Sequence, residues 1–261
     1  MRYWGKNIEI DASFYTTAMG KSLAPTPAEL AQFRATNNLF QNEGNVEVYE
    51  VTIQNMMRDI DNNMVGTILI DAINRAPKTV RIIPLTLKEE MRKKPLGPCN
   101  NGVKAPSGTG NDSVIWFEPW STGWNLIYGG TSPYQILVHE LQHALRTVRG
   151  KIFAPGFTTV SRFTGPGGIV NGFPNLEELF SVTFENMFLS ALGQPQRMRN
   201  TYNPITPLNN RSDRDWYKQH GAALDVWCDD FRDLTPRLEG IFGIWNPIRV
   251  RRMVLDGLVT L

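Results

Sequence analysis

The spacing of apolar residues along the chain predicts a mixture of helices and short strands. Residues 48–73 carry apolar side chains at helical spacing, with a break near residues 63–66, which predicts two consecutive helices. Residues 79–85 and 113–117 are rich in β-branched and apolar side chains, so each is expected to form a strand. We therefore predict an α+β fold.

Three further segments have the signals of helix starts and ends. One helix is expected from the capping residue Ser132 to a stop at Gly150, and another from Asn175 to Gly193. A short helix is expected at residues 27–35. The helix that follows Ser132 carries the candidate chemistry.

Composition narrows the possible functions. The chain has 261 residues, and 27 Lys+Arg against 25 Asp+Glu give a net charge of +2, too small to indicate a nucleic-acid partner. Two cysteines exclude a disulfide-rich scaffold and a zinc site built from cysteines. No segment has the pattern of a signal peptide or a membrane span. Only three histidines are present, and two of them lie four residues apart.

Those two histidines belong to the sequence His139-Glu140-Leu-Gln-His143. Residues four apart share one face of a helix, so both imidazoles can bind one metal ion. Glu140 projects about 100° round the helix, where a carboxylate can accept a proton from water. This spacing is typical of zinc hydrolases and predicts a Zn²⁺ cofactor with Glu140 as general base.

A catalytic zinc needs a third protein ligand. His220 is far along the chain and is interpreted as a surface histidine at a helix end. The candidates are the three acidic residues of the helix after Asn175, which are Glu177, Glu178 and Glu185. Glu178 also fits a capping box and Glu177 also suits the positive end of the helix, whereas Glu185 lies in an apolar stretch and needs a partner such as an imidazole N–H.

Together with Arg199-Asn-Thr-Tyr202, these segments resemble a known group of zinc metalloproteases. They are similar to the light chains of the botulinum and tetanus neurotoxins, and closer to the M91 (NleD-like) family of bacterial effector and toxin-domain metallopeptidases. The resemblance implies a zincin-like fold over roughly residues 40–204.

The resemblance also implies a role for each site residue. Glu178 would be the third zinc ligand, and Glu177 would help to organise the site. Glu185 would support a zinc-binding histidine, and Arg199 and Tyr202 would line the substrate side, where they would stabilise the oxyanion of the tetrahedral intermediate.

The domain organisation is expected to be a single metalloprotease domain over residues 1–261. It would comprise an N-terminal extension (1–39), the catalytic core (40–204) and a helical C-terminal part (205–261), in which Trp216, Trp227, Phe231 and Trp245 pack. The resemblance implies a toxin or effector, secreted or injected into a target cell, that cuts a specific protein substrate of that cell. It could be part of a larger toxin or delivery system.

Three alternatives compete with this interpretation. The first is a zinc-binding, non-proteolytic interaction protein on the same fold, which would not need Glu140, Arg199 and Tyr202. The second is a general degradative peptidase, for which a secretion signal would be expected. The third is a basic interaction module around residues 249–252, where apolar residues interleave the arginines and favour a solvated helix face.

Overall fold

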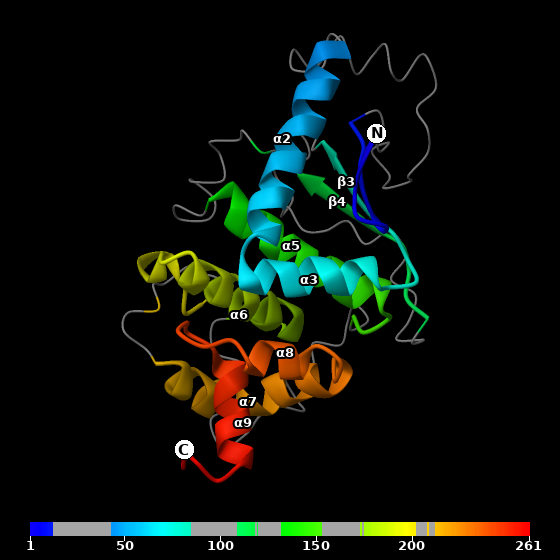
Figure 1. The fold of residues 1–261 in the computed structure, drawn as a ribbon. Helices are drawn as coiled ribbons and strands as arrows, with labels where there is room; N and C mark the ends of the chain where they lie inside the picture. The colour runs from blue at the N-terminus through cyan, green and yellow to red at the C-terminus, as the bar shows by residue number, and fades with distance from the viewer. Residues whose placement is uncertain are drawn as a thin grey trace. The chain divides into compact units, whose positions relative to one another are not determined.

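A computed structural model describes residues 1–12, 43–84, 109–117, 119, 132–152, 173, 175–201, 208 and 212–261. The described residues form a mixed α+β structure with seven α-helices and one four-stranded sheet (Figure 1). The predicted α+β class is confirmed at this level. In chain order, the elements are β1 (Arg2–Trp4), β2 (Ile8–Ile10), α2 (Glu43–Asp61), α3 (Met64–Asn74), β3 (Val80–Pro84), β4 (Ser113–Phe117), α5 (Pro133–Val148), α6 (Leu176–Ala191), the 3₁₀ helix η4 (Pro195–Arg197), α7 (Asp213–Asp230), α8 (Thr235–Glu239) and α9 (Pro247–Leu255).

The sheet has the strand order β1-β2-β3-β4. β1 and β2 are antiparallel, whereas β2 pairs with β3 in parallel and β3 with β4 in parallel. The register places Ile8 beside Val80 and Val80 beside Ser113. The two predicted strands are confirmed as β3 and β4. β1 and β2 were not predicted, because three residues are too few to show an alternating pattern.

Asn74, at the end of α3, fixes the turn between β1 and β2. Its side-chain oxygen accepts hydrogen bonds from the backbone N–H groups of Lys6 and Asn7, each at 2.9 Å. Gly5 has a φ of +71°, and a Cβ there would meet the Asn74 side chain at 2.3 Å. A glycine is therefore required where the turn meets the helix.

The break between α2 and α3 confirms the predicted division of residues 48–73. The buried Asn63 caps α3, and its side-chain oxygen accepts from the backbone N–H groups of Val65 at 2.9 Å and Gly66 at 3.3 Å. Because the cap ends one helix and starts the next, α2 and α3 can each bury their own apolar face. The helix expected at residues 27–35 lies outside the described residues.

The described chain divides into two compact units. One comprises Met1–Ile60, Ile73–Ser121 and His143–Ile152, and the other comprises Asp61–Ala72, Thr122–Gln142 and Phe153–Leu261. α5 contributes residues to both. Among the described residues, no helix combines the length and the apolar character that crossing a bilayer requires.

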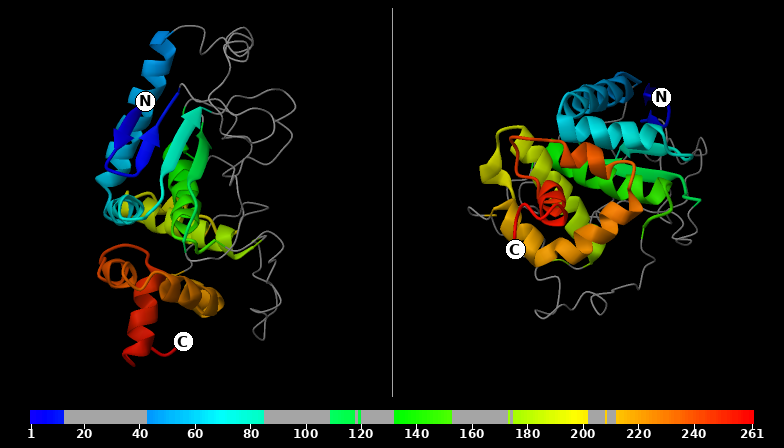
Figure 2. Two further views of the ribbon diagram at one scale, coloured as in Figure 1. Left: turned by 90° about the vertical axis from the view of Figure 1, so that its right-hand side faces the viewer. Right: turned by 60° about the horizontal axis from the view of Figure 1, so that its bottom comes forward.

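In the second unit, α9 packs against α7 and α8 (Figure 2). Large aromatic side chains are buried in this part of the chain. Trp216, Trp227 and Phe231 are each at most 1% exposed, so their predicted packing is confirmed. The rings of Trp227 and Phe231 stack with their centroids 4.8 Å apart. Trp245 meets Trp216 edge to face at 5.3 Å.

The prediction that His220 is a surface histidine at a helix end is wrong. α7 continues past it to Asp230, and His220 is 5% exposed with its ring centroid 4.7 Å from that of Trp216. The two residues are four apart and share a helix face, which buries both. The helix continues through Gly221. The Tyr217 ring packs against this glycine, since a Cβ there would lie only 3.1 Å from the ring.

The arginines of α9 have acidic partners. Arg251 contacts Asp225 at 2.8 Å and Glu239 at 3.5 Å, and Arg252 contacts Asp256 at 2.7 Å. These ion pairs offset part of the positive charge of the helix.

Gly110 brings the chain against the C-terminal end of α5. The next residue, Asn111, donates its backbone N–H to the carbonyl of Thr147 at 3.1 Å. Gly110 has a φ of +68°, and a Cβ there would lie 2.0 Å from the carbonyl oxygen of Val148. The close approach therefore needs both the backbone conformation and the small size of glycine.

We predict that Gly110→Ala destabilises the protein more than Gly193→Ala does. Gly193 has a φ of +69°, but a Cβ added there would meet no atom within 4 Å, so alanine adds only backbone strain of about 1–2 kcal/mol. At Gly110 the clash adds a further ~1–3 kcal/mol. Urea denaturation followed by circular dichroism measures both losses, and equal losses would contradict the close approach.

Cys228 is buried in α7. Burial raises the pKa of its thiol to about 12. We predict that a Cys99→Ser variant, in which Cys228 is the remaining cysteine, does not react with a thiol reagent at pH 8 while folded and reacts fully in denaturant. An ordinary thiol, with a pKa of about 8.5, is partly ionised at that pH and reacts readily. Rapid reaction of the folded variant would show that this part of α7 is open.

Candidate metal centre

The two histidines of the predicted motif lie on one face of α5. The helix begins where expected, since the Ser132 hydroxyl accepts a hydrogen bond from the backbone N–H of Gln135 at 3.3 Å. His139 and His143 are 5% and 3% exposed, so both imidazoles are buried on the side of the helix that faces the protein. Their spacing is set by a single regular helix and needs no other support.

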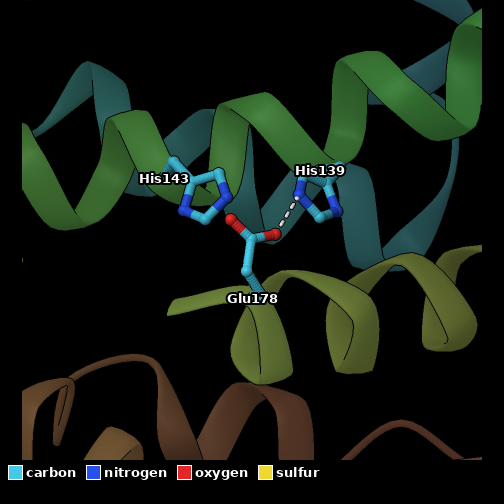
Figure 3. Close-up of side chains that lie close together, drawn as sticks. All are labelled: His139, His143 and Glu178. Carbon is cyan, nitrogen blue, oxygen red and sulfur yellow. Dashed lines mark hydrogen bonds and ion pairs between the residues drawn. The ribbon is translucent and has the colours of Figure 1, made fainter. Parts of the chain in front are cut away.

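α6 supplies the carboxylate that faces them. Asn175 caps this helix, and its side-chain oxygen accepts from the backbone N–H of Glu178 at 3.0 Å. The Glu178 side chain projects from the first turn of α6 toward α5 (Figure 3). The predicted helix start and the predicted cap are both confirmed.

His139, His143 and Glu178 form a group that can hold a metal ion. One ligand atom from each residue lies within 4.8 Å of the other two. In a tetrahedral zinc site, bonds of about 2.0–2.2 Å place the ligand atoms roughly 3.3–3.6 Å apart. The observed separations require only small side-chain movements to reach these values, and two imidazoles with one carboxylate are donors that zinc prefers. The residues therefore fit a zinc ion.

The distance between His139 and Glu178 shows how closely the donors converge. Nε2 of His139 lies 3.0 Å from Oε2 of Glu178. Glu178 is partly exposed, with 17% of its side chain accessible, whereas His139 is buried. Glu178 is thus the most exposed of the three candidate ligands.

The other ring nitrogen of His139 is held by Glu185. Nδ1 of His139 lies 3.1 Å from Oε2 of Glu185, a residue with no solvent exposure. An imidazole that binds a metal through Nε2 carries its proton on Nδ1 and donates it to such a carboxylate. Glu185 therefore holds the ring with Nε2 toward Glu178 and is not itself in the group of candidate ligands.

Gln135 also hydrogen-bonds Glu185. Its side-chain amide donates to Oε1 of Glu185. Gln135 stands three residues after the capping residue Ser132, as in a capping box, so its place in the site was not predicted. Its position four residues before His139, on the same helix face, was the signal that could have placed it in the site.

Arg199 provides the positive charge that Glu185 needs. Its Nη2 donates to Oε2 of Glu185 and lies 3.2 Å from Nδ1 of His139. Burial raises the pKa of Glu185, but the Arg199 guanidinium and the hydrogen bonds from His139 and Gln135 outweigh burial and lower it. Glu185 therefore stays ionised at neutral pH, and an anionic acceptor faces the imidazole.

The remaining predicted residues are placed as follows. Glu140 is 8% exposed on α5 and lies next to His139 in the sequence. Glu177 is 8% exposed at the start of α6 and is not in the ligand group. Tyr202 lies outside the described residues. The structure therefore brings together His139, His143, Glu178, Glu185 and Arg199.

Comparisons with protein-family models, curated proteins and solved structures found no significant match to this chain. The geometry of the group is therefore the basis for any functional conclusion.

We predict that Glu178→Gln lowers zinc affinity by more than about 100-fold, because the change removes a ligand, and loss of an outer partner alone commonly costs 10–100-fold. Glu177→Gln is the matched control: it removes the same charge one residue earlier, and we expect zinc affinity within a few-fold of wild type. Competition with a chromophoric chelator measures both.

The same measurement with wild type should give one zinc ion per chain. A larger loss in Glu177→Gln than in Glu178→Gln would show that the other carboxylate binds the metal.

Proposed function

We propose that this protein is a zinc-dependent endopeptidase. The observation that supports the proposal is the convergence of His139, His143 and Glu178, with Glu140 on the same helix as the two histidines. This is the donor set of a zinc protease whose third ligand is a glutamate. We propose further that the fold is zincin-like and that the chain is related to the NleD-like metallopeptidases.

The proposed reaction is the hydrolysis of a peptide bond. Zinc held by the three ligands would supply a Lewis acid that activates water and polarises the scissile carbonyl. Glu140 would accept the proton of the attacking water and pass it to the leaving amine. Its low exposure favours this role, because a carboxylate shielded from bulk water transfers protons within the site.

The contacts of Arg199 support a part in holding His139. Its Nη2 lies beside Glu185 and Nδ1 of His139, on the side of the imidazole away from Nε2. The role of Arg199 at the oxyanion stays a prediction, as does that of Tyr202 as an O–H donor to the same oxyanion.

The substrate class and the setting rest on the sequence resemblance. We propose a protein substrate in a target or host cell, cut at a specific bond. A toxin or effector that is secreted or injected, alone or as part of a larger polypeptide, is consistent with this proposal. The alternative is a zinc-binding protein that engages a partner without cutting it.

We predict that Glu140→Gln keeps zinc but lowers cleavage by about 10²–10⁴-fold, the usual contribution of a general base. The experiment compares wild type with Glu140→Gln in target-cell lysate and identifies new peptide termini by mass spectrometry. Termini that arise only with wild type define the substrate.

Zinc analysis of the variant is the control, because equal metal content assigns the loss to Glu140 rather than to the metal site. If both proteins bind zinc and neither produces new termini in any lysate or peptide library, the non-proteolytic alternative replaces the enzyme.

A further inference from the structure

The side chain of Asn186 makes two hydrogen bonds to the backbone of Arg199. Its Nδ2 donates to the carbonyl of Arg199 at 2.8 Å, and its Oδ1 accepts from the N–H of Arg199 at 2.9 Å. Asn186 has no solvent exposure, and Arg199 is 4% exposed. A buried amide that satisfies both backbone groups of one residue fixes the position of that residue tightly.

Backbone hydrogen bonds also hold the residue next to Arg199. Met198 donates its N–H to the carbonyl of Pro195 at 3.1 Å, and its own carbonyl accepts from the N–H of Leu208 at 2.9 Å. These bonds fix the residue before Arg199. The two bonds from Asn186 join the Arg199 backbone itself to α6.

The place where Asn186 holds the chain matters for the metal centre. Asn186 follows Glu185 directly on α6. Its side chain therefore holds the Arg199 backbone near the Glu185 carboxylate, which the Arg199 guanidinium contacts. That carboxylate and Nη2 of Arg199 both lie against Nδ1 of His139. An unbroken set of contacts therefore runs from the Asn186 amide through Arg199 and Glu185 to a metal ligand.

We propose that Asn186 is a positioning residue of the metal centre, which acts through Arg199 and Glu185 to keep the His139 ring in the orientation that turns Nε2 toward Glu178. The proposal rests on the zinc site described above. A residue that only packs α6 would act in the same way without Arg199, whereas the proposed role of Asn186 requires Arg199.

The experiment compares Asn186→Ala with Thr183→Val in the full-length protein. Thr183 is the matched control on the same helix: it is buried, its hydroxyl donates to the carbonyl of Leu179 at 2.7 Å, and it accepts from the Trp216 indole at 3.3 Å. Both variants lose two buried hydrogen bonds, but those of Thr183 do not involve the metal centre. Thermal unfolding of both variants checks that they fold.

The first measurement is zinc affinity. We expect Asn186→Ala to bind zinc about tenfold more weakly, at the lower end of the 10–100-fold effect of outer partners, and Thr183→Val to bind within about twofold of wild type. We expect Arg199→Ala combined with Asn186→Ala to bind as Arg199→Ala alone does, because residues that act through one another are not additive. Additive losses, or equal affinities for Asn186→Ala and Thr183→Val, would overturn the proposal.

The second measurement needs no metal. The ¹H–¹³C chemical shifts of the His139 ring in the zinc-free protein report how the ring is packed, and a chain with three histidines allows assignment by single substitution. We expect one sharp set of ring signals for His139 in wild type and Thr183→Val, and shifted or broadened signals in Asn186→Ala, because the ring is no longer held in one orientation. An unchanged spectrum in Asn186→Ala would overturn the proposal even if the wild-type protein failed to bind zinc, a failure that would instead remove the proposed function.

Discussion

The carboxylate of Glu185 carries a charge in a place that water does not reach. An ion of this kind is tolerated only where enough donors surround it, because its hydration has been lost. The structure supplies donors from two different segments: Gln135 and His139 on α5, and Arg199 after η4. Each of these segments must therefore be in place before α6 can bury Glu185. Removal of one partner from a buried pair commonly costs about 3–5 kcal/mol, which is a large part of the stability of a domain.

The same requirement orders the candidate ligands. Once Glu185 is satisfied, the ring of His139 is held at one nitrogen and presents the other to Glu178. His143 follows from the regular geometry of α5, and Glu178 follows from the cap of α6. Of the three candidate ligands, His139 is thus the one whose orientation depends on how the buried charge is neutralised.

Local patterns predicted the parts of this arrangement that depend on one element at a time. The limits of α5 and α6, the strands β3 and β4 and the histidine pair follow from spacing and capping. The partnership of Glu185 with an imidazole follows from its place in an apolar stretch, where a carboxylate needs a partner. Gln135 was not assigned, although its spacing from His139 on the same helix face was a usable signal. Asn186 could not be assigned, because its role depends on which segment lies beside it. The prediction for His220 was wrong for a related reason: a histidine beside a glycine suggests a helix end, but the Trp216 face buries it within a longer helix.

Glu178 is held in two ways. Its backbone N–H donates to the capping side chain of Asn175, and its carboxylate faces the imidazoles. Each residue of a helix is turned by about 100° from the one before it. A single residue inserted between the cap and Glu178 would therefore swing the carboxylate out of the ligand group while leaving all three ligands encoded in the chain. The length of the first turn of α6 therefore sets the direction in which the Glu178 carboxylate points. An insertion or deletion there would disrupt the ligand group more than many side-chain substitutions would.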